Sequence, residues 1–343
     1  IIADQAAEAS LFTGVVKVTP AHDHSDAEIG VRHHLPVLNV IGEDGKITDQ
    51  APEPYCGLTV NEAREKIIAN LRKLELVREA PIHHSVPLCD RCGTVIQPLI
   101  SKQWFVKMAP LAAPAIAAIT DGLVTFHPPR WKKVALDWLR NVKDWCVSRQ
   151  LWWGHRLPVW YCQAGDHGTR QGEGAHVVFS LTKPARCPTC GGTDFVQDSD
   201  VLDTWFSSAL WPFAVFGWPE ATADLRRFYP TSVLTTAPEI LYLWVTRMIF
   251  SALEFMDGTK YLPAKQYGKR RREQRVPFKD VILHPTVLTL QGKRMSKSKG
   301  IVVDPLELIR QYGADATRFG LLLQLHAGQQ ALRFDEHAIE SAR

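Results

Sequence analysis

A short cationic segment from Arg294 to Gly300 carries the residue types that phosphate chemistry needs. It presents three cations, at positions 294, 297 and 299, and two serine hydroxyls ahead of a glycine. Such a loop suits a leaving pyrophosphate, because its cations offset the negative charge that develops on the phosphates in the transition state. On composition alone, an ordinary basic surface loop stays open as the other interpretation.

Cysteine pairs are the second feature whose side chains could carry out a chemical role. Two pairs have the spacing of half a zinc site, and a further cysteine and a histidine lie between them. The potential ligands are Cys89, Cys92, Cys162, His167, Cys187 and Cys190. They allow a compact ribbon, with three thiolates and one imidazole, or an all-cysteine site that joins the two pairs. Seven cysteines, an odd number, favour metal ligation in a reducing compartment over a disulfide framework.

The elements that must position these residues differ between the two ends of the chain. Near the N-terminus, short β-like runs alternate with turns, and we predict strands over Val15–Thr19 and Val37–Ile41. Thr59, with Glu62 three residues later, predicts the start of a capped helix. From residue 201 to 325, helical and strand patterns alternate, with a helix over 240–255, a buried strand over 280–283 and a helix after residue 304. That alternation predicts a parallel α/β sheet.

Composition sets broad limits on the function. The chain has 343 residues, 45% of them hydrophobic, which predicts two or three domains with real cores. Its net charge of +4 is too small to prove a polyanionic partner. The longest apolar stretch, at 240–250, is too short to span a membrane and contains Arg247. The basic run at 269–275 is interpreted either as a solvated loop or as a contact for a phosphate backbone.

The cationic loop resembles the KMSKS signature of class I aminoacyl-tRNA synthetases, with Arg294 in place of the first lysine. The similarity continues through Asp304–Leu306 and Tyr312–Phe319. The resemblance implies that Lys297 is the main lysine on the ATP phosphates. The implied catalytic residues are Lys297, Arg294, Ser296 and Ser298. The implied ATP site, with Mg²⁺, comprises Lys297, Lys299, His284 and Glu239. The family usually has Thr-Gly-x-Asp where this chain has Thr236 to Glu239, and glycine where it has Pro285.

Three segments resemble the valine-specific branch of that family: Asp137–Arg156, Asp200–Phe213 and Thr19–Asp23. The resemblance implies that Trp205 packs on the aliphatic side chain of the substrate, with Ile240 beside it. A member of the same subgroup that is specific for isoleucine or leucine is the first alternative. A non-catalytic zinc-ribbon module that binds RNA is the second, and it leaves the KMSKS-like loop unexplained.

An aliphatic pocket cannot fully exclude near-isosteres of valine, because one methylene is worth only about 1–3 kcal/mol. Residues 17–26 resemble the heart of the family's editing domain, which hydrolyses threonyl-tRNA. The resemblance implies that Asp26 anchors the α-amino group, and that Lys17, Thr19 and Asp23 line the pocket or meet the terminal nucleotide. Without the resemblance, this segment is a strand followed by a capped turn.

By this resemblance the fold is α/β, part of a Rossmann-like class I catalytic domain with a zinc-bearing connective region and part of a β-rich editing domain. The predicted division is 1–80 for editing, 81–200 for the connective region, 201–325 for the catalytic half and 326–343 for a link to the anticodon-binding domain. In the family, the pair equivalent to Cys89 and Cys92 binds zinc together with a further cysteine pair that this sequence does not contain. The resemblance therefore favours the compact ribbon, formed by Cys162, His167, Cys187 and Cys190, as the site for structural Zn²⁺.

The implied activity is ATP-dependent joining of valine to tRNA(Val), with hydrolysis of threonyl-tRNA(Val) as proofreading. We expect a cytoplasmic, monomeric protein with no membrane partner. The family's His-x-Gly-His signature is absent from the sequence. The chain is therefore interpreted as an internal fragment, which by itself is not expected to activate an amino acid.

Overall fold

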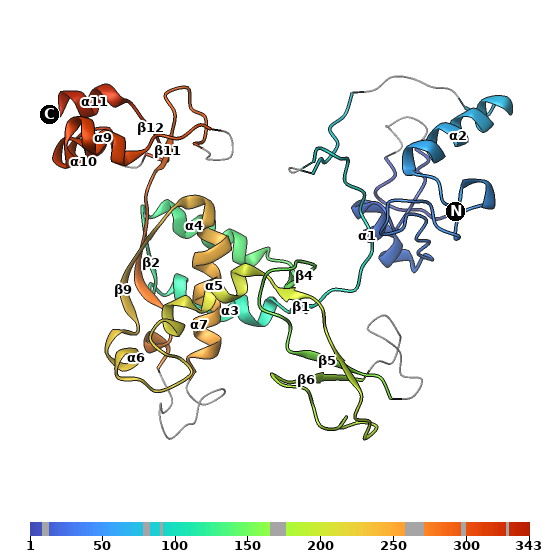
Figure 1. Cartoon of the computed structure of the whole chain (residues 1–343), viewed down its shortest axis with the longest axis horizontal. Coiled ribbons are helices and arrows are strands. Elements are labelled where there is room, and N and C mark those ends of the chain that lie inside the picture. The colour runs from blue at the N-terminus through green and yellow to red at the C-terminus, as the bar shows by residue number, and fades with distance from the viewer. Residues whose placement is uncertain are drawn as a thin grey trace. The chain divides into compact units, whose positions relative to one another are not determined.

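The computed structural model describes residues 1–8, 14–77, 83–89, 92–164, 176–257, 271–295, 300–326 and 329–343. The chain divides into two compact units, Ile1–Lys102 (unit 1) and Gln103–Arg343 (unit 2), shown in Figure 1. The finer division into four regions stays a prediction. Among the described residues, no helix has the length and apolar character needed to cross a bilayer.

Unit 1 is built around two helices whose first turns are capped by side chains. They are α1 (His24–His33) and α2 (Val60–Lys73), with a short 3-10 turn at Glu53–Tyr55. Thr59 Oγ1 accepts a hydrogen bond from the backbone N–H of Glu62 at 3.3 Å, and Glu62 Oε2 accepts one from the N–H of Thr59 at 2.8 Å. This reciprocal pair satisfies two N–H groups that the helix itself leaves unpaired. The predicted capped helix is confirmed.

Replacing Thr59 by alanine is expected to destabilise α2 by about 1 kcal/mol, since the first-turn N–H groups lose their acceptor. Faster amide exchange across residues 60–73 would report the loss. Glu65→Ala is the matched control, because Glu65 is exposed on the same helix and outside the cap. Equal exchange rates in the two variants would mean that the cap contributes nothing.

The two strands predicted in unit 1 are wrong. The described residues of Val15–Thr19 form no strand, and Val37–Ile41 contributes only the isolated bridge between Ile41 and Ile47. Their β-like patterns have no partner of matching length, and strands without a sheet are at best marginal in water. The described part of unit 1 therefore lacks the β-rich character that was expected of it.

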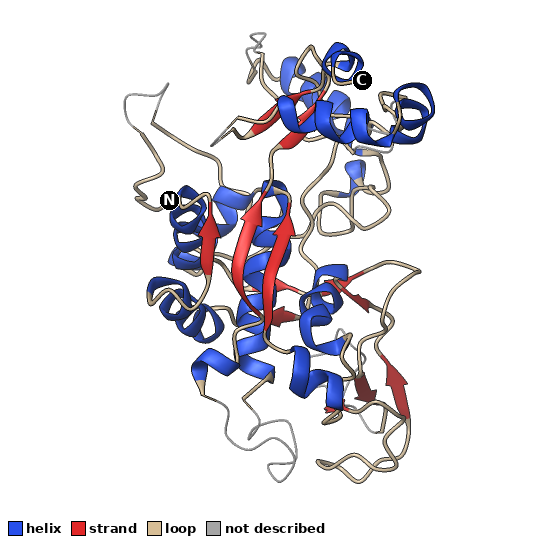
Figure 2. Cartoon of the chain, turned by 90° about the vertical axis from the view of Figure 1, so that its left-hand side faces the viewer, coloured by secondary structure: helices blue, strands red, loops and turns tan. Residues whose placement is uncertain are grey.

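Unit 2 contains the predicted parallel sheet. Its strand order is β2-β10-β9, and both pairings are parallel. The strands are β2 (Thr125–His127), β9 (Thr231–Thr236) and β10 (Phe278–Leu283). The central Val281 lies opposite Phe126 on one side and Leu234 on the other. Figure 2 shows these strands pointing the same way with helices alongside, which confirms the α/β prediction.

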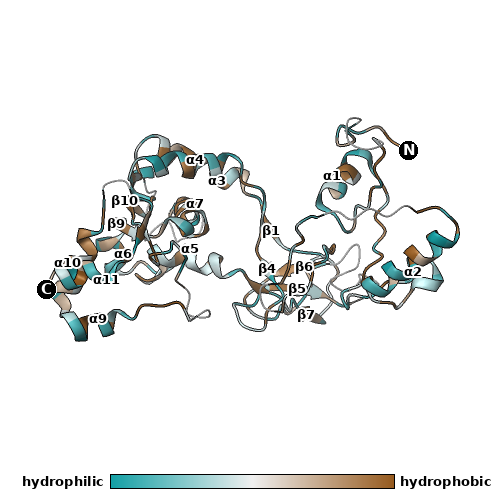
Figure 3. Cartoon of the chain, turned by 90° about the horizontal axis from the view of Figure 1, so that it is seen from above, coloured by the Kyte–Doolittle hydropathy of each residue, from teal (hydrophilic) through white to brown (hydrophobic). Residues whose placement is uncertain are grey.

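Helices beside the sheet enclose the main core. They are α3 (Ala109–Thr120), α4 (Arg130–Arg140), α5 (Thr204–Ala214), α6 (Ala223–Phe228) and α7 (Thr246–Phe255). Helix α7 packs against both α3 and α5, and eight of its ten residues are buried. Figure 3 shows apolar residues on α7. A 3-10 turn (Pro238–Ile240) and a π turn (Leu241–Val245) lead from β9 into it, so the predicted helix at 240–255 is confirmed with an irregular start.

Shorter elements complete unit 2. Two small ladders join β1 (Phe105–Val106) to β3 (Trp145–Cys146) and β4 (Ser148–Arg149) to β8 (Val201–Leu202). A three-stranded sheet contains β5 (Val159–Cys162), β6 (Val177–Phe179) and β7 (Phe195–Gln197). A 3-10 turn spans Arg272–Gln274. The C-terminal part has β11 (Thr286–Leu288), β12 (Ala331–Arg333), α9 (Pro305–Tyr312), α10 (Ala314–Leu323) and α11 (Glu336–Ser341).

Candidate functional site

Asp203 organises the surroundings of the predicted substrate residue Trp205. Its buried carboxylate accepts hydrogen bonds from Trp145 Nε1 at 3.0 Å and from Arg149 Nη2 at 2.8 Å. It also caps the N-terminus of α5 by accepting from the backbone N–H of Trp205 at 3.3 Å. Asp203, the N-cap of α5, thus fixes the backbone of Trp205 in the first turn, and the Trp205 side chain lies half-buried against the main core.

A cavity of about 560 Å³ opens beside Trp205. Its wall includes the indoles of Trp138, Trp145 and Trp205 and the guanidinium groups of Arg149 and Arg247. Aromatic residues beside charged groups of both signs suit an organic molecule that carries charge, since Asp144 and Asp203 also line the cavity. Ile240, the other predicted substrate residue, is half-buried at the end of the 3-10 turn after β9.

Glu239 connects the end of β9 to the hairpin that begins the KMSKS-like loop. Its Oε1 atom lies 3.4 Å from Arg294 Nη2, and its Oε2 atom accepts a hydrogen bond from Thr286 Oγ1 at 3.0 Å. Arg294 forms a bridge with Leu288, and the backbone N–H of His284 donates to Thr236 O at 3.1 Å. The structure therefore brings together Arg294 and Glu239, two residues predicted from separate parts of the sequence.

Four of the predicted loop residues, Ser296, Lys297, Ser298 and Lys299, lie outside the described residues. The expectation that Lys297 and Trp205 share one cleft therefore stays a prediction. His284 is described and exposed, and its Nδ1 atom lies 3.0 Å from the carbonyl oxygen of Pro285.

The predicted editing residues lie together in unit 1, at the start of α1. Asp26 Oδ2 accepts hydrogen bonds from the backbone N–H of Thr19 at 2.6 Å and from its hydroxyl at 3.1 Å. Lys17 Nζ donates to the same hydroxyl at 2.9 Å. Asp23 caps α1 by accepting from the N–H of Asp26 at 2.9 Å. The capped-turn interpretation and the clustering are both seen, whereas an editing role is not tested by this geometry.

His22, which the sequence interpretation missed, ties this turn to other segments of unit 1. Its Nδ1 atom lies 3.0 Å from Pro98 O, and its Nε2 atom accepts from the backbone N–H of Val40 at 3.1 Å. Those partners are 76 and 18 residues away, so no local pattern could have revealed them.

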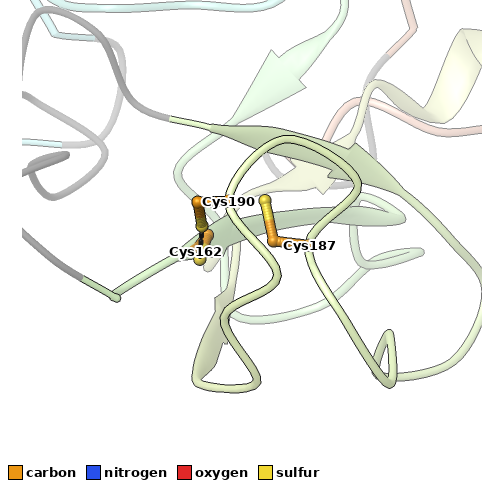
Figure 4. Close-up of side chains that lie close together, drawn as sticks. All are labelled: Cys162, Cys187 and Cys190. Carbon is orange, nitrogen blue, oxygen red and sulfur yellow. Dashed lines mark hydrogen bonds between the residues drawn. The ribbon is translucent and has the colours of Figure 1, made fainter.

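Three cysteines form a candidate metal site in unit 2 (Figure 4). The sulfur atoms of Cys162, Cys187 and Cys190 all lie within 4.8 Å of one another, with 3.6 Å between Cys162 and Cys190. Cys162 ends β5, and the other two lie on a tight turn. In that turn the N–H of Gly191 donates to Cys187 O at 2.9 Å. Three thiols this close match the donor type and crowding of a structural zinc site.

The thiol pKa values within this cluster diverge. Burial opposes ionisation of Cys187, but the N–H groups of Cys190 and Thr189 outweigh it and lower the pKa of Cys187 to about 6. For Cys162, the N–H of Ala164 lowers the pKa, yet burial and the two neighbouring thiols raise it overall. One thiolate is therefore available near neutral pH, and a bound cation would favour the others.

The predicted fourth ligand, His167, lies outside the described residues. A different imidazole, that of His176, lies beside the cluster, with its Nδ1 atom 3.7 Å from Cys187 Sγ. Sequence reasoning overlooked His176, although it precedes Cys187 by only 11 residues.

Cys89 and Cys92 lie in unit 1, on a turn built like that of Cys187 and Cys190. The N–H of Gly93 donates to Cys89 O at 2.8 Å, and the N–H of Cys89 donates to Thr94 O at 2.8 Å. Hydrogen bonds from the Thr94 hydroxyl and backbone lower the pKa of Cys92. Gly93 has a φ of 71° and Gly191 one of 75°, a left-handed conformation that glycine adopts without strain. The two cysteine turns therefore share their backbone hydrogen bonds and a glycine in the left-handed conformation.

Comparison with known proteins gives a consistent result. Residues 23–335 match the family described as tRNA synthetases class I (I, L, M and V). A protein named valine–tRNA ligase from Carboxydothermus hydrogenoformans is 48% identical over 100% of this chain and 36% of its own length. One of the same name from Symbiobacterium thermophilum is 48% identical over 100% of this chain and 35% of its own length. The chain therefore spans about a third of the length of these relatives.

Among solved structures, the methionyl-tRNA synthetase of Mycobacterium tuberculosis bound by methionyl-adenylate is similar, with a TM-score of 0.47 and 16% identity. That similarity covers 75% of this chain and 40% of the other. At this level the similarity carries no conclusion about ligands.

Proposed function

Because the chain belongs to the class I tRNA synthetases of the I, L, M and V family, we propose that it forms part of a valine–tRNA ligase. The observation that carries this choice of amino acid is identity of nearly half, along the whole chain, to proteins of that name. In this proposal the substrates are valine, ATP with Mg²⁺, and tRNA(Val), and the product is valyl-tRNA(Val).

The cationic loop would act on ATP. Lys297 and Lys299 supply positive charge to the phosphates, Ser296 and Ser298 supply hydroxyl donors, and Arg294 begins the loop. These groups offset charge on the departing pyrophosphate, which lowers the barrier for attack by the valine carboxylate. Two further residues, His284 and Glu239, would contact the nucleotide from the ends of β10 and β9. Mg²⁺ supplies neutralisation of phosphate charge when it is bound.

Trp205 would form one wall of the valine pocket, with Ile240 near it. Its position is supported by the cap that Asp203 provides and by the adjoining cavity. A rigid indole fixed at the first turn of α5 limits the volume available beyond a small branched side chain. Discrimination from larger aliphatic substrates would follow from that limit.

Trp205→Ala is expected to lower kcat/KM for valine activation by about 10- to 100-fold, because the wall loses its apolar contact. Trp205→Phe, which keeps an aromatic wall, should retain most of the activity. ATP–pyrophosphate exchange on the protein that contains this chain measures both variants. If the alanine variant keeps both its kcat/KM for valine and its preference for valine over isoleucine, Trp205 does not form part of the valine pocket.

The cluster around Asp26 would bind the misactivated substrate during editing. Its carboxylate accepts from the Thr19 backbone and hydroxyl, and its negative charge would attract the α-ammonium group of the substrate. Lys17, Thr19 and Asp23 would complete the pocket. Such a pocket would form hydrogen bonds with the hydroxyl of threonine, which valine lacks. Threonine would therefore be removed selectively.

Asp26→Asn is expected to slow hydrolysis of threonyl-tRNA(Val) by about 10- to 100-fold, the worth of one hydrogen bond to a charged group. Valine activation should be unchanged in the same variant. Asp49→Asn is the matched control, because Asp49 is exposed in the same unit. Deacylation of preformed threonyl-tRNA measures the effect, and equal rates in the two variants would contradict the assignment.

Structural Zn²⁺ is proposed at Cys162, Cys187 and Cys190 with one imidazole. The three clustered thiols fit this ion, and they leave a fourth position for His167, as predicted, or for the nearby His176. Cys89 and Cys92 would form half of a second site. The role is structural, because thiolate-rich sites of this kind close off the coordination sphere.

The decisive experiment is amino-acid-dependent ATP–pyrophosphate exchange together with charging of tRNA(Val), on the protein that contains this chain. Exchange that requires valine supports the proposal. Exchange driven by isoleucine or leucine would move the protein to another branch of the family. Binding of RNA without any exchange would favour the zinc-ribbon module instead.

A further inference from the structure

Three aspartates are buried within one short segment of unit 2, residues 198–203, which we call the aspartate segment. Asp198, Asp200 and Asp203 are 1%, 3% and 6% exposed. The segment follows β7 of the cysteine-bearing ribbon (β5, β6 and β7) and ends at the N-cap of α5, the helix that contains Trp205. A buried carboxylate costs free energy unless hydrogen bonds compensate it, so the donors to these aspartates show what the segment holds in place.

Asp198 connects the aspartate segment to the ribbon. Its Oδ2 atom accepts hydrogen bonds from the hydroxyl of Tyr161 at 2.8 Å and from Trp104 Nε1 at 3.0 Å. Its Oδ1 atom accepts from the backbone N–H of Asp200 at 2.9 Å. Tyr161 lies on β5, immediately before Cys162 of the candidate metal site. One buried carboxylate therefore fixes the ribbon next to Trp104.

Trp104 extends these contacts to β4. Its indole donates to Asp198, and its backbone N–H donates to Ser148 Oγ at 2.8 Å. Ser148 is buried and directly precedes Arg149, whose Nη2 atom donates to Asp203 at 2.8 Å. Strand β4 also pairs with β8, which lies within the aspartate segment. The contacts of Asp198 and those of Asp203 thus meet on the same short strand.

Backbone hydrogen bonds hold both ends of the aspartate segment. The N–H of Asp198 donates to Val159 O in β5 at 2.8 Å, and the N–H of Asp203 donates to Val147 O at 2.7 Å. The Asp203 carboxylate then accepts from the backbone N–H of Trp205 at 3.3 Å. Close-packed protein interiors transmit displacements, so a shift of the ribbon at Asp198 would also shift the first turn of α5.

We propose that Asp198 is a positioning residue for the valine pocket: it fixes the ribbon against β4 and thereby keeps Asp203 and Trp205 in place. The inference rests on the proposed function, because it takes Trp205 as a wall of that pocket. Neither Asp198 nor Tyr161 lines the cavity beside Trp205, so neither would touch a substrate bound there. The ribbon consequently has a role in substrate binding in addition to the proposed binding of zinc.

Tyr161→Phe removes one hydrogen bond to Asp198 and keeps the buried aromatic ring. On the protein that contains this chain, the KM for valine in ATP–pyrophosphate exchange is expected to rise by about three- to tenfold, which corresponds to the loss of one hydrogen bond. The kcat value and the KM for ATP should stay close to those of the parent. A variant that merely contains less folded protein would instead show a lower apparent kcat with an unchanged KM for valine.

Tyr229→Phe is the matched control. Tyr229 is 5% exposed against 6% for Tyr161, and its hydroxyl also donates a hydrogen bond, to Arg275 O at 2.6 Å. It belongs to a separate core cluster, so its KM for valine should match that of the parent. Asp198→Asn should raise this KM at least as much as Tyr161→Phe, because the amide has one acceptor oxygen in place of two. An unchanged KM in Tyr161→Phe, or an equal rise in Tyr229→Phe, would overturn the proposal.

A second measurement needs no substrate. The indole N–H of Trp145 donates to Asp203, so its ¹⁵N–¹H NMR signal, identified by its loss in Trp145→Phe, reports on the far end of these contacts. Tyr161→Phe should shift that signal, and Tyr229→Phe should leave it in place. A signal that stays in place in Tyr161→Phe would overturn the proposal even where valine-dependent exchange is observed. A shifted signal in a protein without such exchange would contradict the proposed function alone.

Discussion

Replacing Asp203 by alanine is expected to lower the free energy of unfolding of unit 2 by about 3 kcal/mol, the lower end of the cost for a buried ion pair, because the side chain of its partner Arg149 is 37% exposed. The substitution leaves Arg149 without its carboxylate and leaves Trp145 Nε1 without an acceptor. It also removes the N-cap of α5, which by itself is worth about 1 kcal/mol. Trp205 would then lose the hydrogen bond that positions its backbone.

Denaturant titration of the variant measures this cost. Asp137→Ala is the matched control, because Asp137 pairs with Arg140 at 3.4 Å with both side chains more than half exposed. Exposed pairs contribute at most about 1 kcal/mol, so the control should stay close to the parent protein. If both variants lose the same small amount, the Asp203 network does not hold α5 in place.

Removing the zinc proposed above is expected to unfold the ribbon formed by β5, β6 and β7. The three strands have only three or four residues each, and the small core beneath the turn contains Cys162 and Cys187 themselves. Too little apolar surface is buried there to stabilise the ribbon, whereas a structural zinc supplies about 10 kcal/mol of folding free energy. Chelation should therefore abolish amide protection in β5, β6 and β7 and spare the parallel sheet.

Cys187→Ser should have the same effect and should reduce the bound zinc by about one equivalent per chain. Cys56→Ser is the matched control, since Cys56 is half-buried in unit 1 and outside both cysteine turns. Unchanged zinc content in Cys187→Ser, measured by elemental analysis, would rule out this site. Comparing His167→Ala with His176→Ala identifies the imidazole: only the variant of the true ligand should release metal.

The two capped helix starts, at Thr59 and Asp304, were predicted correctly, and the N-terminal strands were not. The caps at Thr59 and Asp304 rely on hydrogen bonds between residues two or three positions apart, so the sequence contains all the information they need. Strands need partners that the pattern does not name. In the parallel sheet, Val281 pairs with Phe126 and Leu234. The segment Val15–Thr19 pairs with no strand among the described residues.

For the candidate site, the residue types and local motifs were determined by the sequence: the cationic loop, the two cysteine turns and the segment around Asp26. The tertiary structure alone decided which distant groups meet them. Asp203 reaches Trp145 across 58 residues, and Glu239 accepts from Thr286 across 47. The cavity beside Trp205 is likewise lined by residues from segments that are distant in the sequence. Contacts of this kind depend on how the apolar faces of helices and strands pack together. No fixed spacing along the sequence predicts which distant residues that packing brings into contact.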